Sequence, residues 1–161
     1  MINERIVAEL GLTDTRYVET EDDWVDPHAQ GHQPAEGQVE LNFNNFSSMG
    51  ASGAMGSTTD DMTVWAEALA TSELISPELH DQRLVGAPLT ERPEYDEYAL
   101  GIGSLDGWWD HTGEGQGFTA LAMHDVESEA SVVISMDISN AVVSSEGGEE
   151  VYRQRAHSTD A

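Results

Sequence analysis

The chain has 161 residues, the size of one domain, and its 31 acidic residues against six Lys+Arg give a formal net charge of −25. All six cations are arginines, and because such a field repels phosphate, neither nucleic acid nor an anionic membrane is predicted as a partner. The sequence contains no cysteine, which excludes a disulfide framework, a thiolate nucleophile and a sulfur-ligated zinc site.

The acidic residues are spread along the sequence and predict a solvated surface. An evenly acidic surface without lysine is typical of proteins from salt-loving organisms, where ambient cations screen the self-repulsion. We therefore expect the melting temperature, followed by circular dichroism, to rise between dilute buffer and molar salt. A melting temperature that stays constant or falls would contradict this hypothesis.

The N-terminal stretch MINERIVAELG predicts a short helix. Its apolar face carries Ile2, Ile6, Val7 and Leu10, and Gly11 would end it. No capping residue precedes the helix, so the chain is expected to begin inside or just before one. The stretch lacks the cationic start and apolar centre of a signal peptide, and no apolar run reaches the roughly 18 residues of a membrane span. The sequence therefore does not determine the cellular compartment, and an extracytoplasmic parent protein is one of the alternatives.

Residues 20–48 form a predicted long loop that is rich in proline, glycine and asparagine. A loop of this length usually lies over a functional surface or is mobile. Within it, Asp26, His28 and His32 could converge on a metal, because histidines four residues apart share one face of a helix. Pro27, Gly31 and Pro34 argue against a helix there, so loop histidines are the expected alternative. We predict no metal and no cofactor.

The stretch GASGAMGSTTDDMTVWAEALATSE predicts a glycine-rich approach to a helix. Ser57 is the expected N-cap, and Asp60 and Asp61 follow in the first turn, where the helix dipole favours anions. A second short helix is expected to begin at Ser76-Pro77-Glu78, a cap followed by proline in the first turn. The apolar stripe of the first helix consists of Met62, Trp65, Ala66 and Leu69.

After residue 97 the hydrophobic period changes to two, with one run that alternates Tyr98, Leu100 and Ile102. Turn sequences at 106–107 and 126–129 separate the runs and predict an antiparallel meander near residues 97–138. Together with the helices this gives an α+β fold class, in which an antiparallel β-sheet packs against helices within a single incomplete domain over 1–161. Residues 144–161 form an acidic tail that is a candidate for mobility, with a short helix predicted near 149–155.

Three stretches of the second half are candidates for chemistry. GIGSLDG superficially matches a dinucleotide loop, but strands follow it where a helix is needed, so hairpin glycines are expected. The pair His124-Asp125 ends a strand and is expected to be a polar hairpin end, not a catalytic dyad. The triplet His111-Thr112-Gly113 lies between a strand and a glycine-rich turn, and either a catalytic edge or a decorated hairpin fits that position.

Several stretches resemble, in order and spacing, the serine penicillin-recognising family, which holds class C beta-lactamases, D-Ala-D-Ala carboxypeptidases and related esterases. Its third motif, K-T-G or H-T-G followed by a glycine-rich turn, Phe and two core strands, is similar to residues 111–137. ELGLTDTRY resembles its PLGMxxT segment, GASGAMGSTTDDMTVWAEAL its AGGLxSTxxDLxxF helix entry, SELISPEL its xLLSPE, and EYALGIG its YGLGW. The resemblance covers about residues 4–139 and implies a partial beta-lactamase/transpeptidase-like fold.

The resemblance also implies roles for the third motif. His111 would line the pocket near the general-base machinery, and the Thr112 hydroxyl would hydrogen-bond the substrate carboxylate or carbonyl. The backbone N–H of Glu114 would be one oxyanion-hole donor. Gly113 would keep a side chain away from the approaching acyl group. Histidine in place of lysine supplies a group that titrates near pH ~6.5, so activity is expected to vary through that range.

The family's nucleophile is the serine of S-x-x-K, which cannot occur here without lysine, and none of the four tyrosines begins a Y-x-N motif. No serine lies in G-x-S-x-G, and Ser52 has no histidine or acid at an interpretable spacing. We therefore expect the C-terminal part of a beta-lactamase-related serine hydrolase that is inactive alone, the parent acting on a peptide, lactam or ester. The alternative is a non-catalytic peptide-binding module or an inactive remnant of the same fold. The predicted partners are that small-molecule substrate and the missing N-terminal half or another copy.

Overall fold

The structure, a computed structural model, describes residues 1–35, 38–41, 46–71, 74–90, 95–115, 117–139, 142–144 and 151–153. The chain forms two compact units, each assembled from three segments that alternate along the sequence. The first unit contains Met1–Tyr17, Met55–Thr112 and Leu121–Ile134, and the second contains Val18–Ala54, Gly113–Ala120 and Ser135–Ala161. The single incomplete domain expected over 1–161 stays a prediction.

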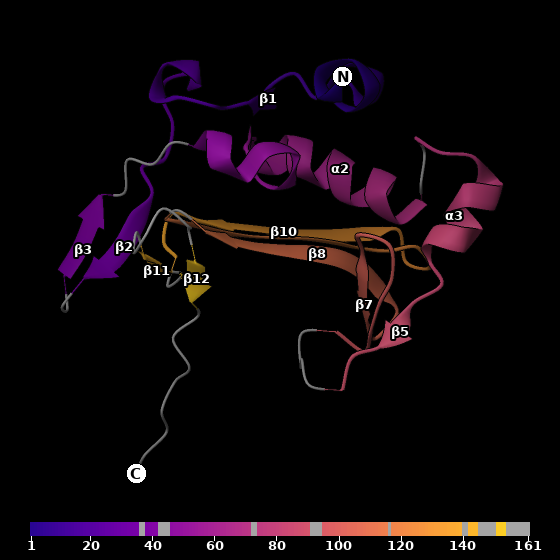
Figure 1. The fold of residues 1–161 in the computed structure, drawn as a ribbon. Coiled ribbons are helices and arrows are strands. Elements are labelled where there is room, and N and C mark those ends of the chain that lie inside the picture. Colours follow the sequence, from indigo (N-terminus) through magenta and orange to yellow (C-terminus); the bar gives the residue numbers. More distant parts are fainter. Residues whose placement is uncertain are drawn as a thin grey trace, which may run out of the picture. The chain divides into compact units, whose positions relative to one another are not determined.

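The first unit begins with the predicted N-terminal helix, formed by η1 (Asn3–Val7) and α1 (Ala8–Leu10). Gly11 ends it in the left-handed conformation with φ 66°, as its position in the sequence predicted. No side chain caps its start. The helix lies beside α2 (Thr59–Thr71), the long helix of the unit (Figure 1).

The start of α2 differs by one residue from the prediction. Thr58, not Ser57, is the cap, because its Oγ1 accepts a hydrogen bond from the Asp61 N–H at 3.2 Å. Asp61 is itself only 8% exposed, and its Oδ2 accepts from the backbone N–H of Asp14 at 2.9 Å and from the Thr15 hydroxyl at 2.7 Å. These bonds to a carboxylate tie the segment after the N-terminal helix to α2.

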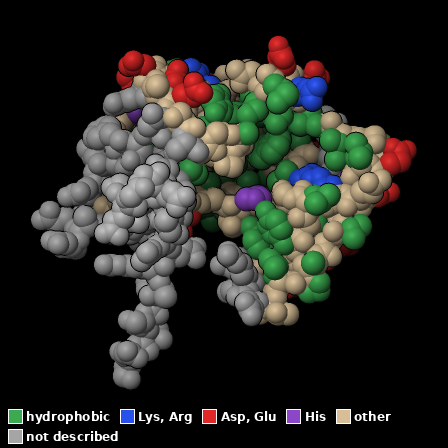
Figure 2. Space-filling model, in the orientation of Figure 1, with side chains coloured by type: hydrophobic (Ala, Val, Ile, Leu, Met, Phe, Trp, Pro, Cys, Tyr) green, Lys and Arg blue, Asp and Glu red, His purple; other side chains and the backbone are tan. Residues whose placement is uncertain are grey.

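The second helix, α3 (Pro77–Arg83), has the predicted cap and first-turn proline, with the Ser76 side chain accepting from the Leu79 N–H at 3.4 Å. Arg83, at its C-terminal end, donates from Nη1 to the carbonyl of Leu69 at 2.8 Å and from Nε to the carbonyl of Leu100 at 3.2 Å. Arg83 thereby joins the last turn of α2 to the sheet. In Figure 2 hydrophobic side chains gather around these helices, with acidic side chains at their margins.

The predicted meander is a six-stranded sheet with the order β10-β9-β8-β7-β6-β5. The pairs β5–β6, β6–β7 and β7–β8 are antiparallel. In the first unit, α2 lies along one face of β8 and β10 (Figure 1), so the α+β class with an antiparallel sheet is confirmed. The strands are β5 (Ala87–Pro88), β6 (Glu97–Tyr98), β7 (Gly103–Leu105), β8 (Trp108–Gly115), β9 (Phe118–Asp125) and β10 (Ala130–Met136).

The run predicted as one strand through Tyr98, Leu100 and Ile102 is instead two strands joined by a tight turn. The Ala99 N–H donates to the carbonyl of Ile102 at 2.8 Å, and Gly101 has φ 69°. Leu100 therefore lies at the turn and is 69% exposed, whereas Ile102 is fully buried. The turns predicted at 106–107 and 126–129 are present, the first with positive φ at both central residues, as a type I′ hairpin requires.

The second unit contains the stretch predicted as a loop over 20–48. There η2 (Glu21–Asp23) precedes a hairpin of β2 (His32–Ala35) and β3 (Gln38–Leu41), and η3 (Phe46–Ser52) follows. The sequence prediction missed this hairpin because Pro34 and Gly37 read as loop residues. The unit also contains β11 (Val142–Ser144), which pairs with β12 (Val151–Arg153).

The helix predicted near 149–155 was therefore wrong at residues 151–153, where pairing with β11 imposes a strand. Most of the predicted acidic tail over 144–161 lies outside the described residues. The first unit also contains a small two-stranded sheet, in which β1 (Arg16–Tyr17) pairs antiparallel with β4 (Met55–Gly56). Among the described residues no helix is both long and apolar enough to cross a bilayer.

Candidate active site

Strand β8 presents the H-T-G triplet to solvent. Its burial changes abruptly at Asp110, which is 2% exposed, whereas His111, Thr112, Gly113 and Glu114 are all exposed. The pairing of β7 with β8 ends at the pair Gly103–Asp110, so the triplet lies beyond the last residue that β7 pairs with. The triplet is thus on β8, at residues that form no backbone pair with β7.

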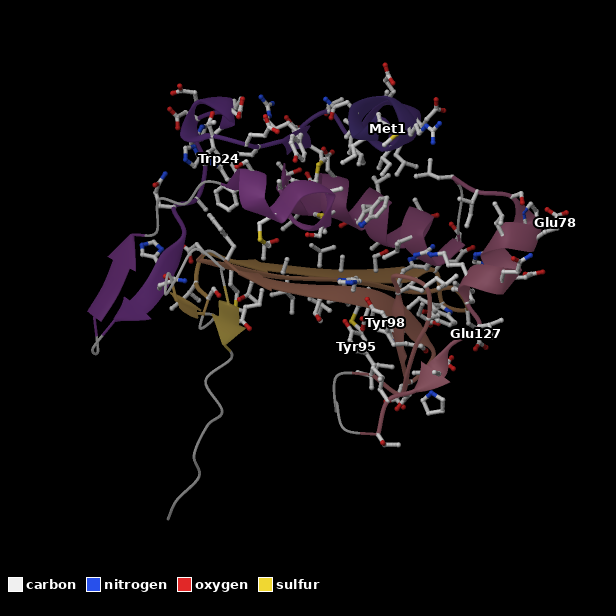
Figure 3. The ribbon with its side chains drawn as sticks, in the orientation of Figure 1. Met1, Trp24, Glu78, Tyr95, Tyr98 and Glu127 are labelled. Atoms are coloured by element: carbon white, nitrogen blue, oxygen red, sulfur yellow. The ribbon has the colours of Figure 1, made fainter. Side chains whose placement is uncertain are left out.

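Two tyrosines of the first unit contact the triplet where β7 no longer does. The Tyr95 hydroxyl lies 2.8 Å from Oγ1 of Thr112 and accepts a hydrogen bond from the Thr112 backbone N–H at 3.0 Å. The Tyr98 hydroxyl lies 2.8 Å from Nε2 of His111. Figure 3 shows the two tyrosines side by side, and their ring centroids are 5.3 Å apart in an edge-to-face arrangement.

Gly103 makes room for Tyr95. A Cβ atom at position 103 would lie 2.1 Å from Cδ1 and 2.2 Å from Cε1 of the Tyr95 ring. Contacts this short between carbon atoms are strongly repulsive, so only glycine fits at this position with the ring in place. The second glycine of GIGSLDG therefore has a packing role, in agreement with the hairpin interpretation of that stretch.

Asp110 is buried beneath the triplet, and burial raises the pKa of its carboxyl group because the charged form loses hydration. A hydrogen bond with Tyr95 and the neighbouring His111 lower the pKa in part. Burial likewise raises the pKa of Tyr95, while its hydrogen bonds to Thr112 act in the opposite direction. Oδ1 of Asp110 has no hydrogen-bond partner among the described residues. The site thus has an exposed rim of His111 and Thr112 over a buried layer of Tyr95 and Asp110.

Gly113 and Glu114 continue β8 into the second unit. A Cβ atom at Gly113 would meet no atom within 4 Å among the described residues, so packing within the chain does not require glycine there. The Glu114 side chain accepts a hydrogen bond from the Ser139 hydroxyl at 3.4 Å through Oε1. The role proposed for the Glu114 backbone N–H is independent of that side-chain contact.

The predicted loop residues of the second unit pack around the residue that follows the glycine-rich turn. The ring of Trp24 stacks on His28 with centroids 5.0 Å apart, and Trp24 and Phe46 each lie with ring centroids 6.1 Å from Phe118. The His32 N–H donates to the carbonyl of Gly117 at 3.1 Å. Residues of the 20–48 stretch thus pack around the start of β9 within the second unit.

The three residues considered for a metal do not gather. His28 Nδ1 is 3.1 Å from an Asp26 oxygen, but His32 Nδ1 contacts the carbonyl of Asp137 at 2.9 Å. No group of three or more metal-binding side chains occurs in the part of the chain that the structure describes. Across the hairpin, His124 Nδ1 contacts the Ser131 hydroxyl at 2.8 Å, whereas Asp125 accepts a hydrogen bond from the Ser128 hydroxyl. The Ser52 hydroxyl donates to the carbonyl of Met49 at 2.6 Å.

Sequence reasoning identified the triplet but missed Tyr95, Tyr98 and Asp110. The available signal was the pair of tyrosines three residues apart before the glycines of GIGSLDG. That signal was not sufficient, because a run that alternates apolar residues was read as a single strand, which would have placed Tyr98 far from the triplet.

The helices and antiparallel sheet match part of the beta-lactamase/transpeptidase-like fold. The sequence matches the family model for beta-lactamase over residues 1–158, and the chain belongs to this family. No curated protein gave a significant match.

Solved structures show the same fold at low sequence identity. They include a D-stereospecific amidohydrolase from Streptomyces sp. (TM-score 0.71, 23% identity, covering 84% of this chain and 42% of that one). A penicillin binding protein from Bacillus halodurans is also similar, with a TM-score of 0.69 and 19% identity, over 86% of this chain and 44% of that one. A D-amino acid amidase from Ochrobactrum anthropi has a TM-score of 0.67 and 21% identity, over 84% of this chain and 42% of that one. The chain spans less than half the length of these proteins.

Proposed function

We propose that this chain supplies the H-T-G wall of an acyl-serine hydrolase site whose nucleophile is contributed by the remainder of the domain. The observation that carries the proposal is the exposed run His111 to Glu114 on β8 in a chain of the beta-lactamase family. The short span relative to the solved structures supports the same division, since S-x-x-K and Y-x-N are absent from this chain.

In the proposed reaction, the serine oxygen attacks the carbonyl carbon of a peptide, lactam or ester. The C–N or C–O bond to the leaving group then breaks, and the leaving amine or alcohol takes up the proton that the serine gave to the base. Water hydrolyses the resulting acyl-enzyme to the free acid and regenerates the serine. The backbone N–H of Glu114 stabilises the oxyanion, and a donor of this kind contributes about 3–4 kcal/mol to the transition state. The names of two solved neighbours, an amidohydrolase and an amidase, favour amide bonds among these substrates.

Thr112 is proposed to hold the substrate through its hydroxyl. A threonine hydroxyl has one hydrogen to donate and two lone pairs, so its single bond with Tyr95 leaves capacity for a ligand. The exposure of Thr112 allows that ligand to approach. His111 is exposed beside it at the same rim.

In the complete protein, Thr112→Val should lower kcat/KM about 10- to 100-fold, because a hydrogen bond to a charged or developing-charge group contributes roughly 1.5–3 kcal/mol. Thr112→Ser keeps the hydroxyl and is the matched control, expected within a few-fold of the parent. The measurement is steady-state hydrolysis of a chromogenic beta-lactam, a p-nitrophenyl ester and a D-amino acid p-nitroanilide.

Hydrolysis that is equal in the valine and serine variants would contradict the role of the hydroxyl. If the complete protein hydrolyses none of the three substrates but binds an acyl-D-Ala-D-Ala peptide in calorimetry, the chain belongs to a binding module, and the enzymatic proposal fails.

A further inference from the structure

The imidazole of His111 is hydrogen-bonded at both nitrogens. Nδ1 lies 2.6 Å from the carbonyl oxygen of Thr112, and Nε2 lies 2.8 Å from the Tyr98 hydroxyl. The Tyr98 ring also packs edge-to-face against the imidazole with centroids 6.0 Å apart. The ring position and orientation of an exposed histidine are therefore set by two polar contacts and one aromatic contact.

These contacts also determine which nitrogen carries the hydrogen. A carbonyl oxygen only accepts, so Nδ1 must carry a hydrogen to donate to Thr112. In the neutral imidazole Nε2 is then the acceptor, and the Tyr98 hydroxyl donates to it. With Nδ1 committed to the Thr112 carbonyl, Nε2 is the nitrogen whose lone pair faces the Tyr98 hydroxyl.

We propose that Tyr98 is a positioning residue of the active site: its hydroxyl and ring hold the His111 imidazole in the orientation in which Nδ1–H donates to the Thr112 carbonyl, and this orientation maintains the Nδ1–H tautomer. The inference deepens the proposed function and rests on it for its role in catalysis. Tyr95 performs a separate task on the next residue, because its hydroxyl bonds the backbone N–H and Oγ1 of Thr112.

The segment that carries the two tyrosines is itself fixed to the sheet. The Asp96 N–H donates to the carbonyl of Ser104 at 2.8 Å, and Asp96 Oδ2 accepts from the Asp106 N–H at 2.8 Å. Tyr98 pairs with Gly103 in the β6–β7 ladder. Tyr98 is thus held on a strand, and a side chain that is held in this way can restrict the orientation of an exposed imidazole.

The test is the tautomer of His111 in the ¹⁵N-labelled chain, read from proton-detected imidazole nitrogen shifts about two pH units above the reference histidine pKa of ~6.5. The His111→Gln variant identifies the signals. The parent chain should show a single Nδ1–H tautomer at His111, and Tyr98→Phe should lose it and give a mixture. Tyr17→Phe, in β1 of the same unit, is the matched control and should leave His111 unchanged.

Tyr95→Phe separates the two tyrosines: it should speed hydrogen exchange at the Thr112 amide and leave the His111 tautomer as in the parent. An Nε2–H tautomer in the parent chain, or identical His111 signals in the parent and in Tyr98→Phe, overturns the proposal. If Tyr98→Phe does not fold, the parent tautomer alone decides. None of these readouts needs turnover, so failure of the hydrolase assay counts against the proposed function only.

Discussion

The 161-residue chain by itself should hydrolyse neither a chromogenic beta-lactam nor a p-nitrophenyl ester above the buffer rate, whereas the complete domain should hydrolyse at least one. The reason is the missing nucleophile, since loss of the catalytic serine in a serine hydrolase costs on the order of 10⁶ in kcat. The oxyanion that the Glu114 N–H on β8 is proposed to stabilise forms only once a hydroxyl has attacked the substrate carbonyl.

Strand β10 carries exposed apolar side chains. Strand β10 is at one end of the sheet order, and Val132 and Ile134, both in the first unit, are 39% and 47% exposed. Apolar side chains on a strand at the edge of the described sheet are typical of a surface that another polypeptide covers. We propose that the N-terminal part of the domain covers β10, in preference to a second copy of this chain.

Mixing the separately expressed N-terminal part with this chain should then restore hydrolysis, and the mixture should elute as a one-to-one complex in size-exclusion chromatography. The Ile134→Asp variant should prevent both, while Val64→Asp, at an exposed apolar position of α2, is the matched control. Turnover by the isolated chain would show that the nucleophile is within it, and self-association without binding of the N-terminal part would favour a second copy.

The Gly103→Ala variant should lose about 3 kcal/mol of unfolding free energy, the upper part of the range for inserting a methyl group into a packed site. The added Cβ would lie 2.1–2.2 Å from two ring carbons of Tyr95, so the ring must move. Tyr95 is 8% exposed and bonded to Thr112, and its displacement also detaches the backbone of the H-T-G triplet.

Urea unfolding followed by circular dichroism measures this loss. Gly113→Ala is the matched control on β8, where a Cβ meets no described atom within 4 Å, and it should change the unfolding free energy by no more than about 0.5 kcal/mol. In a Tyr95→Ala background, Gly103→Ala should cost much less, which gives a coupling energy above about 1 kcal/mol. Additive effects of the two substitutions would show that the ring and the glycine do not share this space.

The sequence by itself determined the elements whose signals are local. Ser76-Pro77 at α3, Gly11 after the N-terminal helix and the Asp106-Gly107 turn each depend on the conformations that those residues favour, and all three are present. The ordered motifs likewise indicated the beta-lactamase family, which the family model confirms. These elements and motifs can be predicted without a structure, because each depends on residues that are close together in the chain.

The environment of His111 and Thr112 was decided only by the tertiary structure. The contacts of Tyr95 and Tyr98 join residues 13 to 17 positions apart, across a turn at Gly101. The alternation of apolar residues in this run predicted a continuous strand, so the turn was not expected. The same holds for Asp61, which bonds Asp14 and Thr15 more than 40 positions away. The physical reason is that the hydrophobic period and the turn residues specify which face of an element is buried. Side-chain hydrogen bonds between elements depend instead on which distant segments pack against each other in the tertiary structure.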